Sequence, residues 1–198
     1  MENRFRSQRS RVLNRYFSLQ EHLLVPAEQV ASPNFNERPA GEVSLLVIHN
    51  ISLPPGEFGA GYITDLFCNR LDPDAHPYFA EIAHLQVSAH LLITRTGRVV
   101  QYVPFDKRAW HAGASCFEGR DNCNDFSIGI ELEGTDDTPY TSEQYDVLSV
   151  VTRALMKAYP AITPQRITGH CDIAPDRKTD PGPIFDWPRF IGSLQSTL

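Results

Sequence analysis

The feature that most constrains the fold is a short, almost wholly apolar run, VSLLVI, at residues 43–48. A run of this kind, rich in β-branched residues, fits a central strand covered on both faces. The run ends at His49 and Asn50, and the prolines and glycines of the next segment, ISLPPGEFG, force an irregular loop. Because sites in α/β sheets gather at strand ends, His49 is well placed to reach a cleft; the alternative is a histidine that only caps the strand.

Length, composition and charge narrow the class of protein. A chain of 198 residues with 41% hydrophobic residues suits one soluble globular domain, with room for an appended arm. No run approaches the roughly 18 apolar residues that a membrane span needs. The net charge of −6 disfavours a nucleic-acid backbone as a partner. We therefore expect no nucleic-acid partner and no membrane span.

The first fifteen residues differ from the rest because they carry five arginines against one acid. No apolar segment follows them, so a secretory signal is not supported. They predict an irregular or weakly helical arm, or alternatively a contact with a membrane surface or a partner. A stretch rich in turn formers begins at Ser32, and we place the domain boundary there: an arginine-rich arm or strapping segment over residues 1–31 and a compact domain over residues 32–198.

The cysteines indicate a reducing compartment. They form no C-x-x-C pair, and the chain is too large to need disulfide staples, so we expect free thiols in a reducing cytosol. A bridge between Cys116 and Cys123 stays open as an alternative. The four are Cys68, Cys116, Cys123 and Cys171.

Hydrophobic spacing and turn residues place the remaining elements. A capping box at Thr141 and Gln144 opens a long amphipathic helix that Pro160 stops after Tyr159. Gly97 should take a positive φ in a hairpin turn. His90 lies inside an apolar strand and is interpreted as a hydrogen-bonded core residue. Further elements are expected at residues 17–30 (a short helix or a strapping segment), 62–69, 78–84 and 186–194 (helices), and 166–170 (a strand).

The stretch FSIGIELEG, residues 126–134, alternates between apolar and polar or small residues. This pattern predicts a strand with one buried face and one solvated face. Glu131 lies on the second face, and Gly129 beside it should leave space in front of the carboxylate.

A polar, turn-rich loop, TGHCDIAPDRKTDPG at residues 168–182, is the strongest candidate for a site. His170 and Asp180 are spaced so that the loop can fold back on one ion, and His49 would complete a catalytic zinc site with two imidazoles and one carboxylate. Lys178 lies two residues before Asp180 and should point to the same side. The neighbouring Cys171 should point away.

With zinc at these ligands, the chemistry is that of a hydrolase. Glu131 would take the proton of the attacking water and pass it to a leaving amine, and Lys178 would stabilise the oxyanion. The segment FDKRAWHAG, residues 105–113, places Trp110 among cations and suits a sugar ring or an anionic peptide; alternatively, the Trp closes an edge of the core.

Several blocks in order resemble one known family: LLVIHNISLPPGEFG, AEIAHLQVSAHLL, QYVPFDKRAWHAG, CNDFSIGIELEGTD and TGHCDIAPDRKTDPGP. They are similar to the AmpD family of N-acetylmuramoyl-L-alanine amidases, over roughly residues 32–190. The resemblance implies a mixed α/β fold shared with peptidoglycan recognition proteins, in which helices flank a central mixed sheet with a zinc cleft. It implies a cytoplasmic enzyme, which we expect to be monomeric, that cuts 1,6-anhydro-N-acetylmuramoyl peptides between the lactyl group and L-alanine.

The resemblance also carries over to single residues. It implies that the zinc ligands are His49, His170 and Asp180, that the catalytic residues are Glu131 and Lys178, and that Asn50 and Trp110 line the substrate cleft.

The chain departs from this family at two positions and in its long N-terminal arm. Close relatives carry arginine where this chain has Gln86 and Asn122, so contacts to stem-peptide carboxylates should differ, with Arg120 or Arg108 as substitutes. A binding module that kept the fold and lost catalysis is the alternative function. The complete set of metal ligands and proton-transfer residues favours the enzyme, and no H-E-x-x-H helix supports a zinc peptidase.

Overall fold

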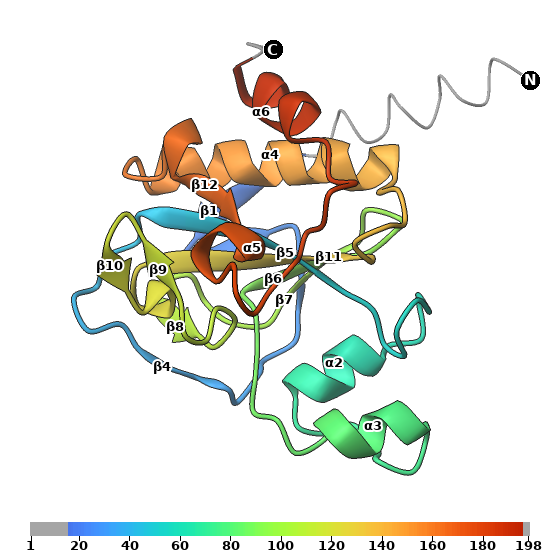
Figure 1. Cartoon of the computed structure of the whole chain (residues 1–198). Coiled ribbons are helices and arrows are strands. Elements are labelled where there is room, and N and C mark those ends of the chain that lie inside the picture. Colours follow the sequence, from blue (N-terminus) through green and yellow to red (C-terminus); the bar gives the residue numbers. More distant parts are fainter. Residues whose placement is uncertain (1–15, 196–198) are drawn as a thin grey trace, which may run out of the picture.

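A mixed sheet forms the centre of the molecule, which is described here by a computed structural model over residues 16–195. The arginine-rich arm expected over the first fifteen residues lies outside this range. Within the described residues the central sheet has six strands (Figure 1), in the order β12 (Ile167–Gly169), β5 (Leu45–Ile51), β11 (Ser127–Glu133), β6 (Leu91–Ile93), β7 (Val99–Gln101) and β3 (Glu28–Gln29). The first four run parallel to their neighbours, β7 is antiparallel to β6, and β3 is parallel to β7.

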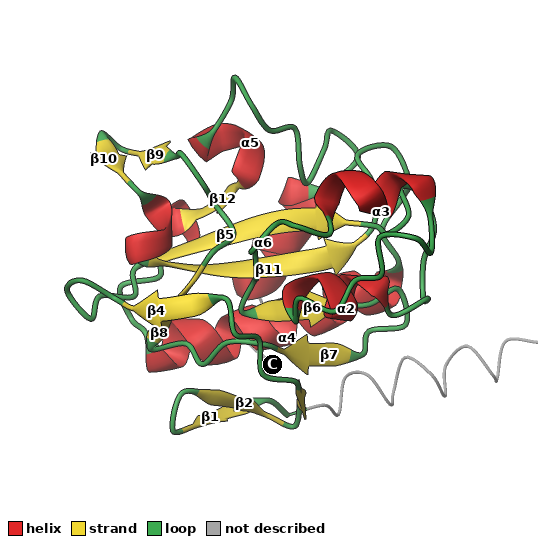
Figure 2. Ribbon diagram, turned by 90° about the horizontal axis from the view of Figure 1, so that it is seen from below, coloured by secondary structure: helices red, strands yellow, loops and turns green. Residues whose placement is uncertain are grey.

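Helices cover both faces of this sheet, which confirms the predicted mixed α/β class. The long helix α4 (Ser142–Ala158) lies along one face, and α6 (Trp187–Gln195) packs against it from outside (Figure 1). The opposite side carries α2 (Tyr62–Phe67) and α3 (Pro77–Ile82), as Figure 2 shows from below. No helix among residues 16–195 is long and apolar enough to cross a membrane.

The sequence accounts well for α4. The side chain of Thr141 accepts a hydrogen bond from the Gln144 amide, and the side-chain oxygen of Gln144 accepts one from the Thr141 amide, so the predicted capping box is formed. The predicted apolar stripe faces the sheet, and the helix ends at Ala158, just before Pro160. The buried members of that stripe are Tyr145, Leu148, Val151 and Leu155.

Residues 17–30 form strands, so the helix that was one alternative for them is wrong. β1 (Ser18–Gln20) and β2 (Leu23–Val25) make a hairpin through Glu21 and His22, both at positive φ. The segment straps onto the domain because Phe17 and Leu24 are buried in the main core. The Leu24 amide donates to the buried side chain of Gln101 on β7, at 2.7 Å from Oε1.

The smaller elements complete the chain. Gly97 has a φ of 74° in the turn between β6 and β7, as predicted. The two helices expected over 62–69 and 78–84 are present in shortened form as α2 and α3. All four cysteines are free.

The remaining elements are β4 (Phe35–Glu37) paired with β8 (Lys107–Ala109), β9 (Cys116–Phe117) paired with β10 (Arg120–Asp121), α5 (His170–Ile173), and the 3-10 helices η1 (Cys123–Asp125) and η2 (Pro164–Arg166).

The prediction for β11 was half wrong, because the strand is buried on both faces. Its apolar residues face α4 as expected. The polar and small residues on the other face are also shielded from solvent, because they lie under the cleft and the segments around it. This polar face is where the candidate site forms.

Candidate metal centre and active-site cleft

The register of three parallel strands brings the predicted residues together. β11 pairs with β5 so that Glu131 stands opposite His49. On the other side of β5, Gly169 of β12 stands opposite Ile48, and His170 follows directly as the first residue of α5. Asp180 reaches the same place from the loop after α5, so residues far apart in sequence meet at one edge of the sheet.

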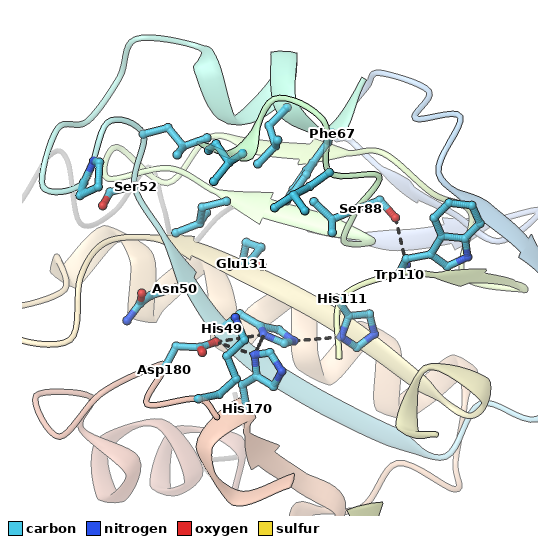
Figure 3. Close-up of a pocket in the computed structure, with 18 of the residues that line it drawn as sticks. His49, Asn50, Ser52, Phe67, Ser88, Trp110, His111, Glu131, His170 and Asp180 are labelled. Atoms are coloured by element: carbon cyan, nitrogen blue, oxygen red, sulfur yellow. Dashed lines mark hydrogen bonds and ion pairs between the residues drawn. The ribbon is translucent and has the colours of Figure 1, made fainter. Parts of the chain in front are cut away.

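Three side-chain atoms converge there (Figure 3). His49 Nδ1 lies 3.0 Å from His170 Nδ1 and 3.0 Å from Asp180 Oδ2, and His170 Nδ1 lies 3.1 Å from the same oxygen. Both imidazoles are buried. Among the described residues, these three form the cluster of histidine and carboxylate groups able to hold a metal ion.

The donor set fits a divalent cation. His170 Nε2 lies 3.0 Å from the carbonyl oxygen of Ala112, which can only accept, so in the neutral ring the proton is on Nε2. Nδ1 therefore turns a lone pair toward a carboxylate oxygen, an arrangement that a cation stabilises. Two imidazoles and a carboxylate are also a common ligand set for catalytic zinc, and ligands roughly 2.0–2.1 Å from zinc stand about 3.3 Å apart in tetrahedral geometry.

Electrostatics also favour the metal-binding forms of His49 and Asp180. Burial lowers the pKa of His49 to about 4, so its imidazole is neutral near pH 7. Burial opposes ionisation of Asp180, but its contacts with His170 and His49 outweigh that effect and lower its pKa below the usual value.

Glu131 is the second unusual group in the cleft. It is buried, and its Oε2 has no hydrogen-bond partner among residues 16–195. Burial, and then the nearby charge of Asp180, raise its pKa well above that of an ordinary carboxyl group, while Lys178 acts in the opposite direction. A buried carboxyl with a raised pKa and a free oxygen is suited to accept and donate protons.

These groups lie in one open cleft of about 380 Å³. Lys178 lines it together with Glu131 and the three ligand candidates. The part of the cleft away from them is apolar and is built by α2, α3 and the chain around them. We call this part the apolar wall; its residues are Leu53, Leu66, Phe67, Tyr78, Ile82, Leu85 and Val87.

Two of the three proposed substrate-contacting residues line the cleft, and the third does not. Asn50 and Trp110 line the cleft, and each is held by a hydrogen bond: Asn50 Nδ2 to Asp136 at 2.8 Å and Trp110 Nε1 to Asn36 at 2.7 Å. Arg120 does not line it. Its guanidinium donates to Glu42 at 2.8 Å and stacks on the Phe126 ring.

The other positions noted for stem-peptide contacts also lie outside the cleft lining. Arg108 is paired with Asp125 at 2.5 Å. Gln86 and Asn122 are exposed, and Asn122 has a positive φ of 61°.

Sequence reasoning missed the part played by His111. Its Nδ1 lies 2.9 Å from His49 Nε2, so it touches a ligand candidate directly (Figure 3). Burial lowers the pKa of His111 well below the usual value. The space expected above Gly129 is filled by this ring, because a Cβ on Gly129 would stand 2.5 Å from His111 Cγ. The motif WHAG contained the signal, but it was interpreted only through its Trp.

Comparison with known proteins decides the family. The sequence profile of the N-acetylmuramoyl-L-alanine amidases matches residues 39–183. The chain belongs to this family. AmpD of Salmonella typhimurium (strain SL1344), a 1,6-anhydro-N-acetylmuramyl-L-alanine amidase, is 67% identical over 168 residues, which cover 84% of this chain and 89% of the relative.

Solved structures agree with this assignment. The crystal structure of a selenomethionine derivative of AmpD has a TM-score of 0.87 at 62% identity, and the match covers 89% of this chain and 98% of that one. AmiD from E. coli, solved with a substrate, has a TM-score of 0.57 at 28% identity, covering 89% of this chain and 65% of AmiD. The predicted resemblance to AmpD, the fold and the amidase class are thus confirmed.

Proposed function

We propose that this amidase hydrolyses the amide between the lactyl group of 1,6-anhydro-N-acetylmuramic acid and L-alanine, in the recycling of peptidoglycan fragments, with zinc as its metal. The AmiD structure in complex with anhydro-N-acetylmuramic acid-L-Ala-D-γ-Glu-L-Lys supports this class of substrate. The observation that carries the proposal is the meeting of a metal-binding cluster and the unpaired, buried Glu131 carboxyl in one cleft.

The metal would be held by His49, His170 and Asp180. When bound, zinc supplies Lewis-acid polarisation of the substrate carbonyl and lowers the pKa of water. The protein's own contribution to binding is a pair of buried imidazoles, of which His49 is neutral near pH 7, and a carboxylate whose ionised form is favoured.

Glu131 and Lys178 would carry the proton and charge changes. Glu131 takes a proton from the attacking water as the water oxygen bonds to the lactyl carbonyl carbon. Lys178 stabilises the negative charge that develops on the carbonyl oxygen. Glu131 then delivers the proton to the alanine nitrogen, the C–N bond breaks, and the products are a lactyl carboxylic acid and a peptide with a free amino terminus.

Recognition would be shared among Asn50, Trp110 and Arg120. The first two line the cleft and can contact the muramoyl peptide where it reacts. Arg120 lies outside the cleft, so we assign it to a part of the stem peptide that extends beyond the cleft.

Three further proposals concern organisation and setting. We propose that the amidase domain spans residues 32–198 and that residues 1–31 are an appended arm, whose described part, residues 16–31, straps onto the domain because Phe17 and Leu24 pack in its core. We propose a cytoplasmic location, which the four free thiols support. We also propose that the enzyme acts as a monomer, because one chain supplies all of the proposed ligand and catalytic residues that line the cleft.

The direct test is incubation of the full chain with anhydromuramoyl-tripeptide, followed by mass spectrometry of the products. We expect free tripeptide and anhydro-N-acetylmuramic acid, loss of the activity with a chelator, and its return with zinc. An uncut ligand that still binds would instead support a non-catalytic binding module. A His170→Ala variant that retained one zinc per chain would remove His170 from the ligand set.

A further inference from the structure

The outward-facing nitrogens of the two candidate histidine ligands are held by two consecutive residues. His170 Nε2 bonds to the carbonyl of Ala112 at 3.0 Å, and His49 Nε2 faces the imidazole Nδ1 of His111 at 2.9 Å. One short segment therefore contacts both ligands on the side away from the metal cluster. Groups in such positions fix the tautomer and the ring orientation of a ligand.

The two contacts differ in chemistry. A carbonyl oxygen can only accept, so Ala112 leaves His170 Nδ1 with a free lone pair. An imidazole nitrogen can accept or donate, so His111 Nδ1 can either accept a hydrogen bond from His49 Nε2 or donate one to it. For His49 Nδ1 to be a ligand atom, its proton must be on Nε2 and His111 Nδ1 must accept it.

A hydrogen-bond acceptor for the remaining ring proton of His111 is also present. With Nδ1 accepting, a neutral His111 carries its proton on Nε2, and Ser127 Oγ lies 3.2 Å from that atom. The hydroxyl is a suitable acceptor and completes a chain that runs from His49 through His111 to Ser127. Nε2 of His49 and both ring nitrogens of His111 are then paired when His49 presents a bare Nδ1 to a cation.

One buried side chain, that of Asn124, holds the backbone of both residues. Asn124 Oδ1 accepts hydrogen bonds from the amides of both His111 and Ala112, at 3.1 and 2.8 Å. The preceding residue, Trp110, is held by two hydrogen bonds to Ser88. Its amide donates to Ser88 Oγ at 3.1 Å, and its carbonyl oxygen accepts from the Ser88 amide. Beneath the ring, the absence of a side chain at Gly129 gives His111 the room it occupies.

We propose that His111 is a positioning residue that holds His49 in the tautomer able to bind the metal, and that Asn124 sets both His111 and the Ala112 carbonyl in place. This inference rests on the proposed metal site and extends it to residues outside the ligand set. Loss of such outer contacts typically weakens metal binding by about 10- to 100-fold.

The test measures the zinc dissociation constant of the full chain by competition with a chromophoric chelator. We expect His111→Leu to bind zinc about 10- to 100-fold more weakly than the wild type. His111→Asn should recover part of the loss, because its amide oxygen can stand near the position of the imidazole Nδ1. The visible spectrum of the cobalt-substituted protein should shift in His111→Leu, since the ligand geometry changes.

His90 supplies the matched control. It is buried, and its ring centroid lies 5.7 Å from that of His111, but its nitrogens contact the Gly129 amide, the Lys107 carbonyl and Arg38, and none contacts a ligand candidate. His90→Leu should lower the free energy of unfolding and leave the zinc dissociation constant within about threefold of the wild type, a small change by the same scale.

Asn124 gives a second pair of variants in case His111→Leu does not fold. Asn124→Ala removes the shared acceptor and should weaken zinc binding, whereas Asn124→Asp keeps an acceptor oxygen and should stay close to the wild type. Equal zinc affinity in the wild type, His111→Leu and Asn124→Ala would overturn this inference alone. So would an equal loss in His90→Leu. A wild type that binds no zinc would overturn the metal site and this inference together.

Discussion

The two ends of the cleft are built in opposite ways. At the metal end, buried polar groups project from β5, β11 and the start of α5, and the register of parallel strands sets their spacing. At the other end, the apolar wall comes from two short helices and irregular chain, and one of its members, Leu85, is 39% exposed. On the proposed mechanism, the reaction therefore depends on groups whose spacing the sheet sets, whereas contact with the substrate at the other end depends on short helices and irregular chain.

The largest effect is expected from Glu131→Gln, which keeps the shape of the side chain and removes its basicity. We expect kcat to fall by roughly 10²- to 10⁴-fold with one zinc still bound per chain, because proton transfer is lost and the ligands are untouched. Steady-state kinetics and metal analysis measure the two quantities.

Glu133→Gln is the matched control for this variant. Glu133 lies two residues further on the same buried face and accepts hydrogen bonds from the amides of Gly59 and Arg95. Its variant should lose stability and keep most of its turnover. Wild-type kcat in Glu131→Gln would place the proton-transfer group elsewhere.

The next effect is expected from Lys178→Ala. Removal of one oxyanion-stabilising donor typically costs about 10²- to 10³-fold in kcat, and zinc content should not change. Lys157→Ala removes a cation from the exposed end of α4 and serves as control. A rise in KM alone for Lys178→Ala would reassign this lysine to substrate binding.

Protonation of the buried histidines at the metal end of the cleft should lower the free energy of unfolding in acid. Burial, and then Arg38, lower the pKa of His90 to about 3, whereas a histidine in the unfolded chain has a pKa of about 6.5. Its stabilising contribution is therefore complete above pH 6.5 and is lost as the pH falls toward 3, at about 1.4 kcal/mol per pH unit.

Urea unfolding of the metal-free protein between pH 4 and 7 measures this dependence. The free energy of unfolding of His90→Leu should fall less steeply as the pH decreases. The difference in slope should correspond to about one fewer proton taken up on unfolding. Arg38 and His111, which face the His90 ring, are present in both proteins, so the difference between them isolates His90. Parallel curves for the two proteins would contradict the lowered pKa.

The smallest effect is expected at the apolar wall. Leu85→Ala should raise KM by about two- to fivefold and leave kcat unchanged, because it removes contact area that binds substrate and transition state equally. Ile184→Ala is the control, since Ile184 is 41% exposed and lies outside the cleft lining. A fall in kcat for Leu85→Ala would mean that the two ends of the cleft are coupled, and the contrast between them would no longer hold.

The same contrast explains what could be predicted from the sequence. A strand was predicted at residues 43–48 and is observed at Leu45–Ile51, so its existence was predictable and its bounds were not. The capped helix α4 and the ligand candidates were also predictable, because they depend on local pattern or on short motifs. The solvated face expected for β11 was wrong, because alternation cannot distinguish a face in water from a polar face buried under a cleft. The part played by His111 depends on strand register and on the space above Gly129, neither of which local sequence reveals.

The topology of the apolar wall has a practical consequence. β5 ends at Ile51 and β6 begins at Leu91, and every residue of the wall lies on the single excursion of chain between them. The excursion carries none of the proposed ligands and neither proposed catalytic residue. Ser88 and His90 follow the wall on this excursion and contact Trp110 and the Gly129 amide. An exchange limited to residues 53–87 would therefore vary the surface offered to the substrate while these two contacts beside the metal cluster stay in place.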